Sequence, residues 1–184
     1  MPTIDYNAKE VLLRFGVAGP ARAGKTQMLW RLHAGLPIEM RAELVMRPVG
    51  EDQIVSFDFT PPDIVPIADH RVRCKAITVP GRIADPAIIA RVMSNLDGVF
   101  FVADSQGERM QANVAALRQI AAVPGLAEVP VVFLYNKRDL PNPVPLAHLD
   151  ELLNRPGAPR FATVATTGEG LGEALSELSR LVLR

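Results

Sequence analysis

The residues with the clearest chemical potential lie between positions 19 and 26, where the sequence reads GPARAGKT. This fits the pattern G-x-x-x-x-G-K-[S/T], in which successive backbone N–H groups surround phosphate oxygens at the positive end of a helix dipole. In such a loop Lys25 reaches the terminal phosphates and the Thr26 hydroxyl is a ligand of Mg²⁺. An apolar run precedes the loop and a helical pattern follows it, as the pattern requires. We therefore predict a nucleoside-phosphate site rather than an incidental glycine-rich turn.

A second polar segment, NKRD at residues 136–139, follows the apolar run 129–135 and bears on which base the nucleotide carries. Parallel sheets bind their ligands at the carboxyl ends of strands, where this segment is expected. Asp139 can accept hydrogen bonds from N1–H and the exocyclic amine of guanine, whereas adenine has no donor at these places. We expect Asn136 to join this segment to the phosphate loop and the Lys137 stem to lie across the base.

A third segment, residues 164–168, indicates guanine recognition more weakly. The backbone N–H of Ala165 is a candidate donor to the guanine 6-oxygen, although taken alone the segment is more simply an ordinary strand-to-helix turn.

The elements that must position these residues follow from alternating apolar runs and helical patterns, which predict a doubly wound α/β sheet. Strands are expected at residues 11–17, 54–59, 71–79, 98–103, 129–135 and 160–165. Helices are expected from the phosphate loop to Gly35 and at residues 85–96, 108–123, 145–153 and 170–182. The second and third strands have no helix between them, so this pair is predicted to be antiparallel.

Composition narrows the class of protein. The chain has 184 residues, with 20 Lys and Arg against 20 Asp and Glu, so there is no electrostatic case for nucleic acid or an anionic membrane. One cysteine, Cys74, excludes an intramolecular disulfide and favours a reducing compartment. We see no signal peptide, membrane span or lipidation motif, and so no covalent membrane anchor is expected. These features predict a cytoplasmic protein.

The combined features resemble the small Ras-like GTPases and, within them, the bacterial MglA family of cell-polarity and gliding-motility switches. The resemblance is carried by residues 57–59 (FDF), 78–81 (TVPG), 101–106 (FVADSQ) and 135–141 (YNKRDLP), and it runs from about residue 4 to residue 183. It implies a P-loop NTPase fold, with a six-stranded, mostly parallel Ras-like sheet and helices on both faces. One G domain would span residues 1–184.

The resemblance also implies cofactors and partners. The cofactors would be GTP or GDP with Mg²⁺, and the partners a roadblock-domain regulator of the MglB type and unknown effector proteins. Such a regulator binds the switch regions and stimulates hydrolysis. The predicted nucleotide contacts are Gly19, Arg22, Ala23, Gly24, Lys25, Thr26, Gln27, Gly81, Asn136, Lys137, Asp139, Ala165 and Thr166.

The metal site departs from the Ras-like pattern. Thr78 stands where most Ras-like proteins have an aspartate that supports Mg²⁺, as it does in the MglA family. A threonine hydroxyl can hold a magnesium-bound water but brings no charge. Asp58 on the neighbouring strand is a candidate for the missing carboxylate, and a solvent-facing Asp58 is equally compatible with the sequence. The predicted metal-site residues are therefore Thr26, Asp58 and Thr78.

The positions that act in GTP hydrolysis also depart from the Ras-like pattern. Arg82 replaces the glutamine that orients the attacking water, and arginine cannot accept a hydrogen bond from water. Gln53 and Ile54 replace the family's arginine–threonine pair, and Ala21 replaces a glycine of the phosphate loop, where its methyl group could crowd the γ-phosphate. An arginine finger alone is worth ~10³–10⁵ in rate. We therefore predict slow or partner-dependent hydrolysis, with the remaining catalytic candidates Lys25, Arg82 and Arg22.

Two other classes of protein stay open. One is a hydrolysis-deficient pseudo-GTPase that serves as a protein-binding scaffold, which the altered switch residues favour. The other is a P-loop kinase of a small metabolite, which leaves residues 136–139 unexplained and lacks an Arg-rich lid insertion.

Overall fold

The central strands form where the sequence has its longest apolar runs. The computed structural model describes residues 3–50, 52–61, 69–81, 86–154 and 157–184, and in it strand β6 (Gly98–Asp104) is buried along its whole length. Its neighbours β2 (Glu10–Ala18) and β7 (Val131–Asn136) are buried at most positions. Strands that are apolar at consecutive positions need cover on both faces of the sheet, as in parallel α/β folds.

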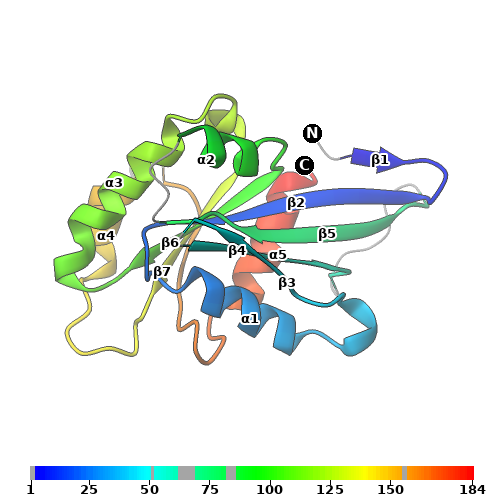
Figure 1. Cartoon of the computed structure of the whole chain (residues 1–184). Helices are drawn as coiled ribbons and strands as arrows, with labels where there is room; N and C mark the ends of the chain where they lie inside the picture. The colour runs from blue at the N-terminus through cyan, green and yellow to red at the C-terminus, as the bar shows by residue number, and fades with distance from the viewer. Residues whose placement is uncertain (1–2, 51, 62–68, 82–85, 155–156) are drawn as a thin grey trace.

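These strands belong to one mixed sheet with the order β3-β4-β5-β2-β6-β7-β8, and β1 pairs with the beginning of β2 (Figure 1). Strands β5, β2, β6, β7 and β8 run parallel, whereas the pairs β1–β2, β3–β4 and β4–β5 are antiparallel. The other strand bounds are β1 Thr3–Asp5, β3 Val45–Val49, β4 Asp52–Phe59, β5 Arg71–Thr78 and β8 Arg160–Ala162.

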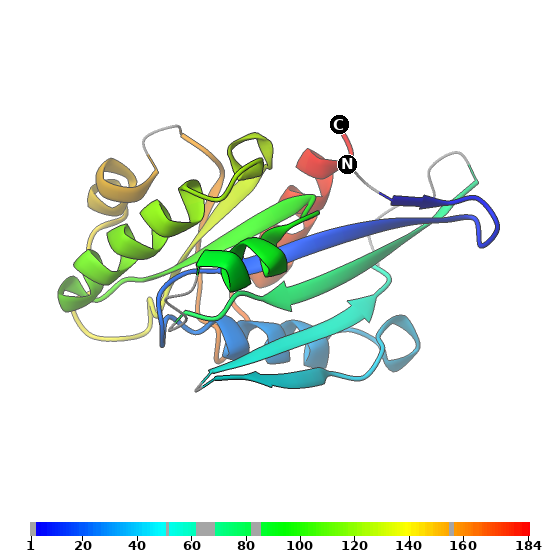
Figure 2. The ribbon, with the colours of Figure 1, turned by 45° about the horizontal axis from the view of Figure 1, so that its top comes forward.

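Helices cover both faces of the sheet. Buried side chains of α1 (Lys25–Gly35) and α5 (Leu171–Val182) pack into one apolar cluster, and those of α2 (Pro86–Met93), α3 (Met110–Ala121) and α4 (Leu146–Leu153) into another. Figure 2 shows α2 and α3 across the sheet from α1. Three short 3-10 helices complete the described elements: η1 Ile38–Met40, η2 Gly107–Arg109 and η3 Leu126–Glu128.

This architecture confirms the predicted α/β fold with a mostly parallel sheet, and the antiparallel pair β4–β5 is also confirmed. The strand number differs, because the described residues form eight strands rather than six. The additional strands, β1 and β3, are exposed at nearly every position. Main-chain hydrogen bonds hold such edge strands without an apolar pattern, so hydrophobic periodicity does not reveal them.

The parallel strands place five connecting loops at one edge of the sheet. The loops after β2, β5, β6, β7 and β8 all leave from the carboxyl ends of these strands, where α/β sheets bind ligands. The phosphate loop and the NKRD segment are two of them. Within the described parts of the chain, no helix has the length and apolar character needed to cross a membrane.

Candidate functional site

The loop between β2 and α1 has a backbone geometry that needs glycine at two positions. Gly19 has a φ of 139°, and a Cβ there would lie 2.1 Å from the carbonyl oxygen of Val102. Gly24 has a φ of 105°, and its Cβ would lie 2.3 Å from Asn136 Nδ2. Helix α1 begins immediately afterwards, and none of the described side chains caps its N-terminus. Its first N–H groups are therefore available to an anion.

Lys25 lies beneath this loop with its ammonium group held by the backbone. The residue is 8% exposed, and its Nζ donates to the carbonyl oxygens of Gly19 (2.9 Å) and Pro20 (2.8 Å). Burial lowers the pKa of Lys25 from 10.5 to about 8, and the nearby carboxylate of Asp52 partly opposes this shift. The free protein thus holds a cation that is poorly hydrated and suited to a phosphate oxygen.

The lowered pKa of Lys25 predicts that nucleotide binding takes up a proton. A bound phosphate favours the charged form and raises the pKa of Lys25. Below pH 8 the amine is already protonated in the free protein, so affinity is nearly independent of pH there. Above pH 8 the free amine is neutral, and affinity falls by up to about tenfold per pH unit. Calorimetry at pH 8 in buffers of different ionisation enthalpy should detect uptake of about half a proton. Zero uptake would contradict the role assigned to Lys25.

A cavity of about 520 Å³ opens at the phosphate loop. Its lining comes from the loop and the start of α1, from the β3–β4 turn and from the end of β5. Several predicted site residues meet in this cavity: Ala21, Arg22, Gly24, Lys25, Thr26, Gln27, Gln53 and Thr78. Ala23 is buried in the loop beneath them. The structure therefore brings the predicted phosphate contacts and two of the predicted metal residues together.

Thr78 is the buried last residue of β5, and its Oγ1 accepts a hydrogen bond from the Val55 N–H (2.9 Å). The hydroxyl can still donate its own hydrogen, so the predicted contact with a magnesium-bound water remains a prediction. The described residues contain no cluster of three or more His, Cys, Asp or Glu side chains suited to a metal. Two neutral hydroxyls, Thr26 and Thr78, fit Mg²⁺ only when phosphate oxygens and waters complete its coordination.

The predicted role of Asp58 at the metal is wrong. Asp58 pairs in register with Lys75 and forms ion pairs with Lys75 (3.2 Å) and Arg73 (3.5 Å). Because β4 runs antiparallel to β5, the residues of β4 that lie beside the end of β5 are its first ones. The carboxylate in the cavity is accordingly that of Asp52, which opens β4 and was not predicted.

Asn136 joins the base side of the site to the phosphate side. Its side chain is buried, Nδ2 donates to the carbonyl oxygen of Ala23 (2.8 Å), and Oδ1 accepts from the N–H of Ala165 (2.9 Å). The predicted link from Asn136 to the phosphate loop is thereby confirmed. The Ala165 N–H already has an acceptor, so its predicted bond to guanine requires sharing or exchange of that hydrogen bond and stays a prediction.

The other predicted base contacts follow the carboxyl ends of β7 and β8. Lys137 has a φ of 66°, and its Nζ donates to Asp104 Oδ2 (2.6 Å), a carboxylate buried at the end of β6. This contact holds the Lys137 ammonium group at the end of β6, and the predicted position of its stem across the base stays a prediction. Asp139 and Thr166 are both exposed and accessible to a base.

A further cation beside the phosphate loop, Arg109, was not predicted. Its Nη2 donates to the carbonyl oxygen of Ala21 (2.6 Å), and its Nε lies 3.7 Å from Asp104 Oδ2. Arg109 lies shortly after β6, at the edge of the sheet where the loops after the parallel strands meet. This position after a buried strand is the feature of the sequence that could have indicated it. Arg82 lies outside the described residues. Gly81 adjoins the loop, since a Cβ there would lie 2.6 Å from the backbone N of Ala21 and from Lys25 Nζ.

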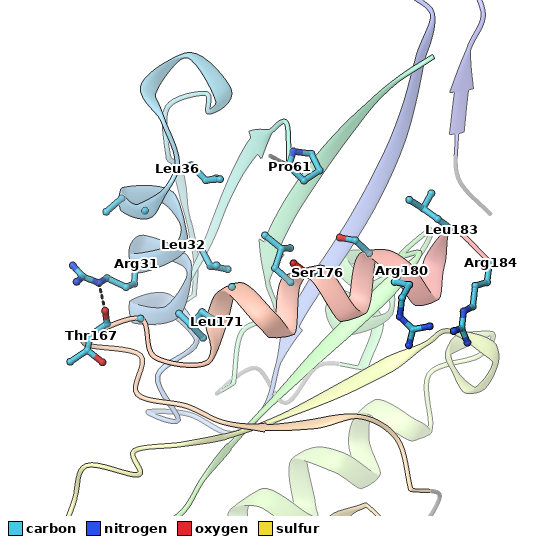
Figure 3. Close-up of a pocket in the computed structure, with 16 residues that line it drawn as sticks. Arg31, Leu32, Leu36, Pro61, Thr167, Leu171, Ser176, Arg180, Leu183 and Arg184 are labelled. Carbon is cyan, nitrogen blue, oxygen red and sulfur yellow. Dashed lines mark hydrogen bonds between the residues drawn. The ribbon is translucent and has the colours of Figure 1, made fainter. Parts of the chain in front are cut away.

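A larger cavity, of about 960 Å³, lies between α1 and α5 (Figure 3). Leu32, Leu36 and Leu171 line it, and Arg31 Nε donates to the Thr167 carbonyl oxygen (2.8 Å) at its rim. Its lining contains none of the phosphate-loop residues and none of residues 136–139. Most of the predicted phosphate and metal contacts therefore line the smaller cavity, whereas the predicted base contacts, residues 136, 137, 139, 165 and 166, line neither cavity.

Comparison with known proteins finds one family and several similar proteins. The family described as "Arf: ADP-ribosylation factor family" matches residues 88–182. Over its full length the chain is 35% identical to the mutual gliding-motility protein MglA of Myxococcus xanthus, 96% of which is covered. It is also 32% identical over 95 residues to ADP-ribosylation factor-like protein 4A of Homo sapiens, and this match covers 48% of each chain.

Proposed function

The chain belongs to the MglA family of Ras-like small GTPases, and from this premise we propose that it is a guanine-nucleotide-dependent switch in bacterial polarity or motility-like regulation. A single G domain, residues 1–184, would carry this function. Family membership supports the binding of guanine nucleotides. The observation that carries the proposal is the Asn136 side chain, which bonds both to the phosphate loop and to Ala165. A nucleotide held by that loop has its base directed to the segment that ends in Asp139.

Guanine specificity is tested by calorimetric titration of the purified protein with GDP, a non-hydrolysable GTP analogue, ADP and ATP. We expect the guanine nucleotides to bind at least about 100-fold more tightly, because adenine leaves the Asp139 carboxylate without its two donors. Equal binding of ADP and GDP, or binding of neither to folded protein, contradicts the proposal.

Magnesium is proposed to accompany the nucleotide. The Thr26 hydroxyl would be a direct ligand and Thr78 would hold a coordinated water, with phosphate oxygens supplying the charge. When bound, the ion neutralises charge on the phosphates. Because the chain's own contribution is two neutral hydroxyls, the nucleotide-free protein is expected to hold the ion weakly.

Hydrolysis is proposed to be slow without a partner. Gln53 lines the cavity in place of an arginine, and Ile54 is half-buried in β4 with no group that can bind a metal or phosphate. We expect a single-turnover rate below ~10⁻⁴ s⁻¹, because an unassisted Ras-like enzyme that keeps its water-orienting glutamine hydrolyses GTP at ~3–5 × 10⁻⁴ s⁻¹. The triple variant Gln53→Arg, Ile54→Thr, Arg82→Gln restores the missing groups and should hydrolyse GTP faster. A wild-type rate that matches an intact Ras-like enzyme contradicts this prediction.

A roadblock-domain regulator of the MglB type is the proposed partner, together with an effector whose identity the chain does not specify. A switch requires a partner to bind the GDP and GTP states with different affinity. Equal affinities for the two loaded forms would favour the alternative, a scaffold locked in one state.

A further inference from the structure

Two backbone N–H groups of the described residues hold the Asp52 side chain in the phosphate cavity. Its Oδ1 accepts from the N–H of Gln53 (2.9 Å), and its Oδ2 accepts from the N–H of Gly81 (3.0 Å). Asp52 is the first residue of β4, and Gly81 follows the end of β5. The carboxylate thus bridges the two segments that border the phosphate loop on one side.

The donors around this carboxylate are close to one another. Gly81 lies so near the phosphate loop that an added Cβ would come within 2.6 Å of both Lys25 Nζ and the backbone N of Ala21. Asp52 also acts on Lys25 electrostatically, since its charge opposes the lowering of the Lys25 pKa. A backbone N–H that donates to an anion, with a buried ammonium group nearby, is the kind of environment that phosphate oxygens require.

We propose that the Asp52 carboxylate occupies the place of the terminal phosphate of a nucleoside triphosphate, and that it thereby sets the preference of the protein between GDP and GTP. This inference rests on the proposed function. A diphosphate leaves the contact between Asp52 and Gly81 intact. A triphosphate brings a second anion to the same donors, and the two cannot share them without strong repulsion. The third phosphate therefore binds only when Asp52 is displaced.

The fold allows this displacement without opening the core. Asp52 adjoins a turn in which Gly50 has a φ of 60°, and the β3 strand on the other side of the turn is exposed at nearly every position. Among the described strands β3 pairs only with β4, so the tip of this hairpin can move while the buried part of β4, around Val55 and Phe57, stays in place.

Asp52→Asn tests the proposal, because it keeps the size of the side chain and removes its charge. Dissociation constants are measured for GDP and for a non-hydrolysable GTP analogue, both with Mg²⁺. We expect the affinity for the analogue relative to GDP to rise at least about tenfold, with the affinity for GDP changing less than about threefold. Asp58→Asn is the matched control: it lies on the same strand, is paired with Lys75 outside the cavity, and should leave the ratio unchanged.

Each result has a defined meaning. An unchanged ratio in an Asp52→Asn protein that binds GDP overturns the role of Asp52 and leaves the proposed function intact. The role of Asp52 is also overturned if Asp52→Asn lowers the affinity for the analogue relative to GDP in the presence of Mg²⁺ but not in its absence, since Asp52 would then support the metal. Wild-type protein that binds neither nucleotide overturns the proposed function itself. Thermal unfolding of both variants verifies that they are folded.

Discussion

Replacing Asp139 with asparagine is expected to lower the affinity for GDP by at least about 100-fold and to create affinity for xanthosine diphosphate. In the proposed site the carboxylate would accept hydrogen bonds from two guanine donors, and a hydrogen bond to a charged group contributes about 1.5–3 kcal/mol. An asparagine amide offers one acceptor and one donor. It therefore faces the guanine amine with a donor, whereas xanthine presents N1–H beside a carbonyl oxygen and matches the amide. Calorimetry with GDP and with xanthosine diphosphate measures the two affinities.

Glu128→Gln is a suitable control for this change of specificity. Glu128 is also an exposed carboxylate, but it precedes the first residue of β7, at the edge of the sheet opposite to the site. It should leave both affinities unaltered. Because Asp139 is exposed, its variant should also unfold at the wild-type temperature. An Asp139→Asn protein that keeps its preference for GDP would show that another group recognises the base.

Replacing Asn136 with alanine is expected to reduce both stability and nucleotide affinity. The substitution leaves the Ala23 carbonyl and the Ala165 N–H without their buried partner. Each unsatisfied buried group costs about 1–3 kcal/mol, so the free energy of unfolding should fall by about 2–6 kcal/mol. The phosphate loop and the Ala165 segment would also lose their connection, and we expect the affinity for GDP to fall by about 100-fold or more. Denaturant unfolding and calorimetry measure the two effects.

The chain supplies a matched control for Asn136. Asn154 is also a buried asparagine whose amide bridges backbone groups: its Nδ2 donates to the carbonyl oxygen of Ala158 (2.7 Å), and its Oδ1 accepts from the Ala158 N–H (2.9 Å). It follows α4, outside the phosphate cavity. Asn154→Ala should cost similar stability and leave GDP affinity nearly unchanged. If both variants lose affinity equally, destabilisation alone accounts for the effect.

The phosphate loop and its link to Asn136 could be predicted because local rules determine them. Gly19 and Gly24 have backbone angles and close contacts that exclude side chains, and the motif encodes this requirement directly. Parallel strands bring their carboxyl ends to one edge, so the meeting of Asn136 with the loop follows from the order of elements alone.

The carboxylate of the site could not be predicted in this way. The predicted antiparallel direction already places the first residues of β4, rather than Asp58, beside the last residue of β5. Which of these residues reaches the cavity depends on the register, and the alternation of apolar residues specifies the register only to within two-residue steps. Asp52 stands six residues earlier on the same strand and reaches Gly81. Arg109 was missed because its contact with the Ala21 carbonyl depends on the direction of a long side chain from a loop.

The hydrogen bonds of Asn136 also affect how the two halves of a nucleotide cooperate. Because the base segment and the phosphate loop are already joined in the free protein, their separation is fixed before any ligand arrives. Once one end of GDP is bound, the other end is confined beside its own subsite at a high effective concentration. Guanosine and pyrophosphate given as separate molecules each lose their own translational freedom, so the intact nucleotide gains a chelate advantage that neither fragment has.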